Sequence, residues 1–136
     1  MAREVFIDAG AWIAVTSRSD QYHALATEVY RRLLREKWTL VTTNLVTAEA
    51  YNGIRRFATQ AQGGAFLASL RESGRIIRIY SDEGLEFEAE QLLRKYADHD
   101  LSLADAVSFV VMRKRNIVDA FAFDNHFMAV GFNLLR

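Results

Sequence analysis

The chain has 136 residues and no cysteine, and its 17 basic and 17 acidic residues cancel. This length suits one hydrophobic core, so we expect residues 1–136 to form a single domain. The lack of cysteine excludes disulfides, thiolate zinc sites and cysteine nucleophiles. A net charge near zero gives no support for a basic nucleic-acid-binding domain, although it is compatible with a basic rim around an acidic pocket.

The start of the chain lacks the basic and then apolar pattern of a secretory signal. No apolar run approaches the roughly 18 residues that would suggest a membrane-spanning helix. We therefore expect a cytoplasmic protein that does not contact a membrane.

Apolar runs typical of buried strands alternate with helical patterns along the whole chain. Residues 21–37 have a 3.6-residue apolar period, whereas residues 38–42 are rich in β-forming side chains. The expected elements, in chain order, are a strand at 4–7, helices at about 11–16 and 21–37, a strand at 38–42, helices at about 45–59 and 65–73, a strand at 76–80, helices at about 82–96 and 102–115, a strand within 117–123, a short helix near 125–130 and a strand at 132–134.

Glycines and short polar residues set several of these boundaries. Asn44 and Ser81 are the predicted N-caps of the helices that follow them, and Gly63-Gly64 predicts a break before the helix at 65–73. Strands separated by helices predict an α/β fold with a parallel sheet covered by helices on both faces. In such a sheet the ligand site lies beyond the carboxyl ends of the strands.

Four acidic residues lie at positions that this fold brings to that edge of the sheet: Asp8, Glu49, Asp105 and Asp124. Asp8 and Asp124 follow apolar strands, whereas Glu49 and Asp105 lie near the starts of helices. Carboxylates that converge in a partly buried pocket repel one another, and a divalent cation is the ordinary way to keep them ionised. The sequence thus predicts a pocket that holds one or two Mg²⁺ or Mn²⁺ ions and hydrolyses phosphodiester bonds.

Each acid also has a purely structural interpretation. Residues 102–105 resemble a capping box, Asp124 could cap the short helix after it, and Glu49 could be a solvated helix residue. Their shared position at one edge favours a common role. His126 lies two residues beyond Asp124 and within reach of the site, but the favoured interpretation is a histidine on the helix surface.

Basic side chains could form a rim that contacts RNA, although solvated helix faces are the default interpretation. Arg55 and Arg56 follow Glu49 on one predicted helix, so they are better candidates than residues 113–115, at the far end of the Asp105 helix. The full candidate set is Arg31, Arg32, Arg35, Lys37, Arg55, Arg56, Arg113, Lys114 and Arg115.

Four phrases resemble, in order, the motifs of PIN-domain ribonucleases, and more narrowly those of VapC toxins from bacterial and archaeal toxin–antitoxin pairs. They are Phe6-Ile7-Asp8-Ala9-Gly10-Ala11-Trp12-Ile13-Ala14, Thr43-Asn44-Leu45-Val46-Thr47-Ala48-Glu49, Leu101-Ser102-Leu103-Ala104-Asp105-Ala106 and Phe121-Ala122-Phe123-Asp124-Asn125-His126-Phe127. The resemblance spans almost the whole chain. It implies a PIN-like three-layer α/β/α sandwich whose parallel sheet has about five strands.

The same resemblance implies a metal-dependent endoribonuclease that uses Asp8, Glu49, Asp105 and Asp124, with Asp8 and Asp105 as the surest metal ligands. It also implies a homodimer, and inhibition by a small cognate antitoxin whose C-terminal segment enters the active-site groove. The chain departs from the family pattern at two positions. Gly10 and Ala122 stand where a hydroxyl or amide that could hydrogen-bond a carboxylate or a metal-bound water is common.

Three alternatives stay open on the sequence. The first is a PIN nuclease that processes RNA without acting as a toxin. The second is a non-catalytic PIN-like module that binds RNA or protein, supported only by Gly10 and Ala122. The third is a receiver-type phosphoacceptor domain, which is disfavoured because no lysine follows the last core strand.

Overall fold

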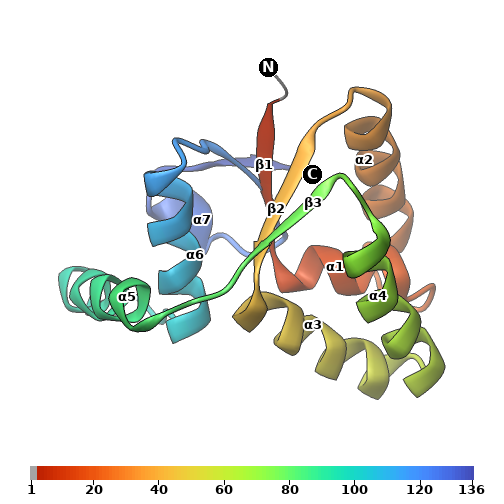
Figure 1. Ribbon diagram of the computed structural model, residues 1–136, viewed down its shortest axis with the longest axis horizontal. Coiled ribbons are helices and arrows are strands. Elements are labelled where there is room, and N and C mark those ends of the chain that lie inside the picture. Colours follow the sequence, from red (N-terminus) through yellow and green to blue (C-terminus); the bar gives the residue numbers. More distant parts are fainter. Residues whose placement is uncertain (1–2) are drawn as a thin grey trace.

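A computed structural model describes residues 3–136, which form a five-stranded sheet with helices on both faces (Figure 1). The elements are β1 (Glu4–Ile7), α1 (Ala9–Thr16), α2 (His23–Arg35), β2 (Thr39–Thr43), α3 (Asn44–Phe57), α4 (Gln60–Glu72), β3 (Ile76–Ile79), α5 (Glu83–Lys95), α6 (Leu103–Lys114), β4 (Asp119–Phe121), α7 (His126–Ala129) and β5 (Asn133–Leu135). The strand order is β3-β2-β1-β4-β5 and every pair is parallel. The predicted α/β/α fold with a five-stranded parallel sheet is confirmed.

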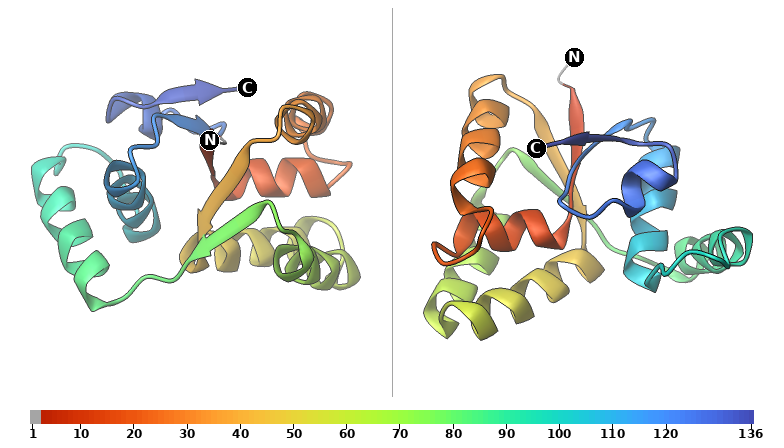
Figure 2. Two further views of the ribbon diagram at one scale, coloured as in Figure 1. Left: turned by 45° about the horizontal axis from the view of Figure 1, so that its top comes forward. Right: turned by 180° about the vertical axis from the view of Figure 1, so that it is seen from behind.

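The helices divide between the two faces of the sheet. α1 to α4 lie on one side, whereas α5, α6 and α7 lie on the other (Figures 1 and 2). This division follows from right-handed crossovers, because the chain moves outward from β1 to β3 and then returns across the sheet to β4 and β5. The strand order therefore reverses beside β1, and a crevice opens there beyond the carboxyl ends of β1 and β4.

The core surrounds β1, whose last three residues are fully buried. A strand that is covered on both faces needs a continuous apolar run, which residues 5–7 supply. On the side of α6 and α7, the ring of Phe127 packs 6.1 Å from that of Phe6 and 5.0 Å from that of Phe109. Within residues 3–136, no helix is both long and apolar enough to cross a bilayer.

The predicted break at Gly63-Gly64 is wrong, because both glycines lie inside α4. The helix begins earlier than expected, where the side chain of Thr59 accepts a hydrogen bond from the N–H of Gln62 at 3.1 Å. A Cβ at Gly63 would lie 3.0 Å from the ring of Tyr51 on α3. Gly63 therefore allows α3 and α4 to approach closely, and packing between the helices outweighs its low helix propensity.

Two predicted caps are displaced by one residue. Thr43, and not Asn44, caps α3, and Asp82, and not Ser81, caps α5. The side chain of Asn44 instead accepts a hydrogen bond from the N–H of Ser81 at 2.8 Å. This bond ties the start of α3 to the loop after β3, at the edge of the sheet where the acids lie.

Candidate active site

The four predicted acids lie in one pocket beyond the carboxyl ends of β1 and β4. Asp8 directly follows β1 and Asp124 follows β4, whereas Glu49 comes from α3 and Asp105 from the first turn of α6. The pocket has a volume of about 590 Å³ and is lined by Asp8, Gly10, Glu49, Asp100, Leu101, Ser102, Asp105, Phe123 and Asp124. Acids that are far apart in the sequence are thus brought together from two loops and two helices.

Asp8 is the most buried of these acids, with 8% of its surface exposed. Its backbone N–H donates to the carbonyl of Phe121 at 3.1 Å, which extends the pairing of β1 with β4 up to the pocket. Burial raises the pKa of Asp8 from 3.8 to about 7; the nearby backbone N–H of Ala9 opposes this shift, and the charges of the other three acids add to it. Near neutral pH and without a cation, the carboxyl of Asp8 is therefore partly protonated.

Glu49 lies at the mouth of the pocket, in the second turn of α3. The residue as a whole is exposed, yet its pKa is raised, first because the pocket partly desolvates the carboxylate and then because of the charges of Asp105 and Asp124. Raised pKa values at both Asp8 and Glu49 mean that negative charge is unfavourable here unless a cation compensates it.

Asp105 has a structural role as well as a place in the pocket. It forms the predicted capping box, in which the N–H of Ser102 donates to Oδ2 of Asp105 and the N–H of Asp105 donates to Oγ of Ser102, both at 3.0 Å. These bonds fix the carboxylate against the start of α6. Of the two carboxylate oxygens they involve only Oδ2.

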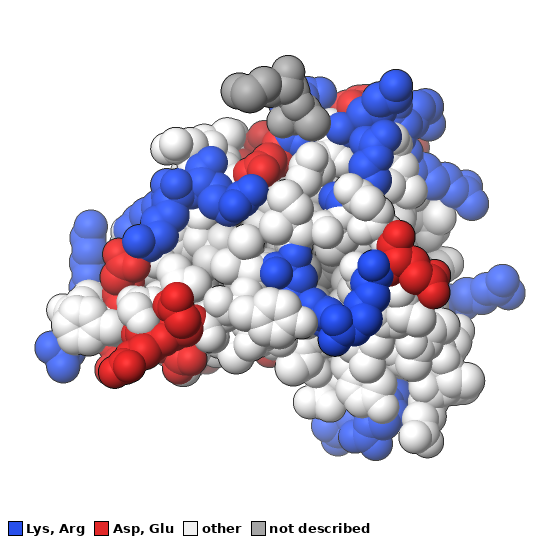
Figure 3. Space-filling model, in the orientation of Figure 1, with Lys and Arg blue, Asp and Glu red and all other residues white. Residues whose placement is uncertain are grey.

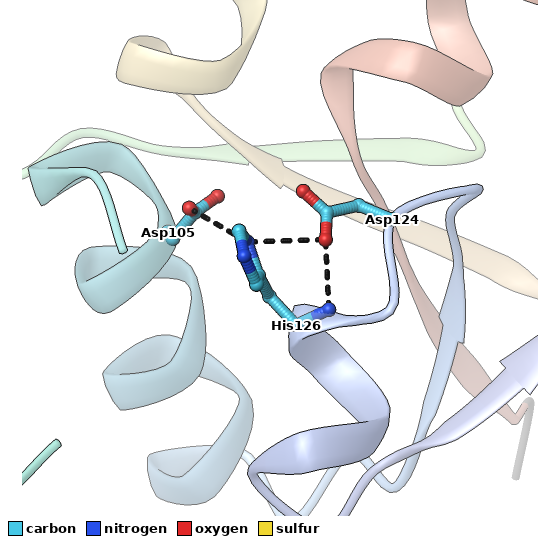
Figure 4. Close-up of side chains that lie close together, drawn as sticks. All are labelled: Asp105, Asp124 and His126. Atoms are coloured by element: carbon cyan, nitrogen blue, oxygen red, sulfur yellow. Dashed lines mark hydrogen bonds and ion pairs between the residues drawn. The ribbon is translucent and has the colours of Figure 1, made fainter. Parts of the chain in front are cut away.

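His126 lies beside two of the acids, so the favoured interpretation of a surface histidine is wrong (Figure 4). Oδ1 of Asp124 accepts a hydrogen bond from the backbone N–H of His126 at 2.7 Å, which fixes the first turn of α7. That turn brings the imidazole Nδ1 to 3.0 Å from Oδ1 of Asp124 and 3.6 Å from Oδ2 of Asp105. The available signal in the sequence was the position of His126, two residues beyond Asp124.

The closest set of possible ligand atoms within residues 3–136 includes this histidine. Asp105, Asp124 and His126 each offer one atom, and these atoms all lie within 4.8 Å of one another. The Nδ1 atom of His126 is buried, and despite its 3.0 Å separation from Asp124 it makes no hydrogen bond of acceptable geometry in the described part of the chain. Carboxylate oxygens and an imidazole nitrogen are chemically suited to a divalent cation.

The two departures from the family pattern differ in their surroundings. Gly10 lines the pocket, and a Cβ at this position would meet no atom within 4 Å. Ala122 is fully buried in the core. A small hydroxyl side chain would therefore fit at position 10, so space in the pocket does not explain the glycine.

A larger groove runs along α2 and is lined by Arg31, Arg32, Arg35 and Arg136, among other residues. Figure 3 shows Lys and Arg side chains gathered at the upper right, over α2, and acidic side chains at the lower left, over α5. The guanidinium of Arg136 donates to the carbonyl of Phe123 at 3.1 Å, and Phe123 lines the acidic pocket. The basic groove and the acidic pocket thus adjoin each other at Phe123.

The basic residues at the end of α6 take part in intramolecular contacts. Lys114 pairs with Glu88 at 2.9 Å, and Arg115 pairs with Glu4 at 2.8 Å. Arg113 donates to the hydroxyl of Tyr96 at 3.4 Å. These contacts agree with the expectation that residues 113–115 are weaker candidates for RNA binding.

Comparisons with known proteins agree with this architecture. A family model of the PIN domain matches residues 5–133. The chain is 34% identical over 134 residues to the 23S rRNA-specific endonuclease VapC20 of Mycobacterium tuberculosis, and the match covers 97% of this chain and 98% of the relative. The crystal structure of the M. tuberculosis VapC20, a sarcin-ricin loop cleaving toxin, superposes with a TM-score of 0.83 and 31% identity over 94% of this chain and 95% of that one.

A more distant structure shares the fold alone. VapBC2 from Rickettsia felis, bound to a DNA fragment from its promoter, superposes with a TM-score of 0.68 at 13% identity over 97% of each chain.

The match to the family model and the similarity to VapC20 show that the chain belongs to the PIN domain family. The resemblance to VapC toxins seen in the sequence is confirmed.

Proposed function

We propose that this chain is a metal-dependent endoribonuclease and the toxin of a VapBC-type toxin–antitoxin pair. The observation that carries the proposal is the convergence of Asp8, Glu49, Asp105 and Asp124 on one pocket at the switch point of the sheet. The similarity to VapC20 over 97% of the chain supports both the activity and the toxin role.

The acidic residues fit one or two Mg²⁺ or Mn²⁺ ions, which would supply an activated water and neutralise charge on the scissile phosphate. Asp8 lies deepest and presents a carboxylate whose pKa is raised to about 7, so a bound cation would favour its ionised form. Asp105 and Asp124 offer oxygens held by hydrogen bonds to backbone N–H groups. Glu49, which is exposed where it lines the pocket, would hold a water bound to the ion.

The first substrate to test is the RNA of the large ribosomal subunit, because the curated relative is specific for 23S rRNA. We expect the purified chain, supplied with Mn²⁺ or Mg²⁺, to cut this RNA in intact ribosomes at one or a few positions, which primer extension would map. EDTA is expected to abolish the cut. Equal cleavage of all RNAs, or none with either ion, would contradict a selective ribonuclease.

The basic groove on α2 provides a path for the RNA backbone toward the pocket. It carries Arg31, Arg32 and Arg35 on α2 and reaches Arg136, which contacts the loop of Asp124 through Phe123 and Asn125. Arginines bind phosphate through paired N–H donors and release counterions, so such a groove attracts RNA without reading its sequence. The acidic pocket alone would repel a polyanion, and the adjoining groove offsets that repulsion.

Replacing Arg31 and Arg35 together by Ala is expected to weaken RNA binding and to reduce the salt dependence of the binding constant. Each lost phosphate contact lowers the slope of log K against log salt by roughly 0.7 to 0.9. Filter binding in EDTA over a range of KCl concentrations would measure this. The matched control is the double variant Arg113→Ala with Lys114→Ala, which removes the same charge from the far end of α6. An equal loss of RNA affinity in the two double variants would contradict a specific path for RNA along α2.

Induction of this chain in a bacterial host is expected to arrest growth, and the Asp105→Asn chain is expected to leave growth unchanged. Co-expression of a cognate antitoxin, sought as a small protein encoded by a neighbouring gene, should restore growth. Normal growth on induction of an active nuclease would favour the RNA-processing alternative. Light scattering on the purified chain and on the pair would test the proposed homodimer and the proposed complex.

A further inference from the structure

A histidine nitrogen lies among the carboxylate oxygens of the acidic pocket. The Nδ1 atom of His126 is buried and has no satisfactory hydrogen-bond partner within residues 3–136. This atom faces carboxylate oxygens of Asp124 and Asp105, which can only accept hydrogen bonds, so the lone pair of a neutral Nδ1 is unsatisfied there unless a cation lies between them. A pocket with four carboxylates makes a cation the natural partner for a lone pair at this place.

The distances around Nδ1 are close to those between neighbouring ligands on one ion. Around an octahedral ion with bonds of about 2.1 Å, adjacent ligand atoms lie about 3 Å apart. Nδ1 of His126 lies 3.0 Å from Oδ1 of Asp124 and 3.6 Å from Oδ2 of Asp105 (Figure 4). Little rearrangement is needed for the three side chains to meet at one ion.

The imidazole is also held in place by its neighbours in the chain. The backbone N–H of His126 donates to Asp124 at 2.7 Å, which couples the two candidate ligands directly. The next residue, Phe127, is fully buried and packs edge-on against Phe109 of α6, the helix that carries Asp105. The imidazole ring is therefore carried by a turn that is packed against α6, and its position is fixed by that packing.

We infer that His126 binds the catalytic divalent ion through Nδ1, together with Asp105 and Asp124. With the proton on Nε2, Nδ1 presents its lone pair to the ion. Mg²⁺ prefers oxygen ligands, whereas imidazole nitrogen suits first-row transition ions, so this ligand set favours ions such as Mn²⁺ over Mg²⁺. The inference rests on the proposed function only for the presence of a divalent ion in the pocket.

Pulsed electron paramagnetic resonance on the Mn²⁺-loaded full chain tests the inference without any nuclease assay. A directly bound imidazole gives a ¹⁴N modulation of the Mn²⁺ echo, and labelling the histidines with ¹⁵N should change its frequencies. The modulation should disappear in His126→Asn, which offers an amide oxygen close to the place of Nδ1. It should persist in His99→Asn, a control that removes a histidine outside the pocket lining.

Mn²⁺ and Mg²⁺ titrations of the same variants give a second measurement. His126→Asn is expected to weaken Mn²⁺ binding by about 10-fold and Mg²⁺ binding by less than about 3-fold, since only the nitrogen ligand is exchanged. Bound Mn²⁺ without ¹⁴N modulation in the parent chain would overturn the inference and leave the proposed nuclease function intact. Failure of the parent chain to bind Mn²⁺ at all would overturn both.

Discussion

Replacing Asp105 by Asn is expected to lower the rate of RNA cleavage by about 10³-fold or more, with little change in fold stability. The pocket loses a negative charge at the position where α6 meets the other acids. An asparagine Oδ1 can still accept the hydrogen bond from the N–H of Ser102, so the capping box and the start of α6 are retained. Asp8→Asn should reduce cleavage to a similar extent.

Single-turnover cleavage in Mn²⁺, with thermal unfolding of the same samples, would measure both quantities. The matched control is Asp100→Asn, which removes the same charge from the polar loop at the rim of the pocket and should keep most of the activity. If the Asp105→Asn and Asp8→Asn chains cut RNA as fast as the parent, the assignment of these acids to catalysis would be wrong. If only the Asp100→Asn chain lost cleavage activity, the catalytic centre would have to be assigned to the loop before α6.

The convergence of the acids could be predicted because it depends on rules that act over the whole sheet. Asp8 and Asp124 follow strands, and all carboxyl ends of a parallel sheet share one edge. Once the alternation of strands and helices is read, no side-chain detail is needed to place them together. The capping box at Asp105 is likewise local, since its partner lies three residues away.

The features that the sequence did not reveal all depend on contacts between distant elements. Thr43 and Asn44 are both good N-cap residues, and what decides between them is Ser81, 37 positions further on, which uses the side chain of Asn44. Gly63 continues a helix because Tyr51 lies against it. His126 reaches Asp105 only because α7 packs on α6, and no local pattern at residues 124–127 contains that contact.

The high pKa of Asp8 predicts that the metal-free protein loses stability as the pH rises. The folded state holds the Asp8 proton up to about pH 7, whereas the unfolded chain releases it near the ordinary value of 3.8. Between these values the folded state binds more protons than the unfolded state, so the free energy of unfolding falls with increasing pH. The rise of the pKa from 3.8 to about 7 corresponds to about 4 kcal/mol of stability, which is lost progressively between about pH 4 and pH 7.

Asp8→Asn should therefore be more stable than the parent in EDTA at pH 8, by about 4 kcal/mol or about 14 °C in Tm, and no more stable near pH 4. The asparagine keeps an acceptor for the backbone at the start of α1 but carries no charge to desolvate. Thermal unfolding of both chains from pH 4 to 8 would measure the difference, with Asp98→Asn as a control because its side chain is 89% exposed. A difference that is independent of pH would contradict a buried, titrating Asp8.

Addition of Mn²⁺ at pH 8 should narrow this difference and, at high concentration, reverse the order. An ion that binds only the folded state stabilises it by about 2.7 kcal/mol at 100 times its Kd and by about 4.1 kcal/mol at 1,000 times its Kd, so we expect the parent chain, which presents the full set of carboxylates, to become the more stable one above about 1,000 times its Kd. The charge on Asp8 thus destabilises the folded protein without a cation and stabilises it with one. This behaviour is expected of a carboxylate whose role is to bind a cation, and not of one that stabilises the fold. If Mn²⁺ raised the Tm of Asp8→Asn as much as that of the parent, Asp8 would have no part in binding the ion.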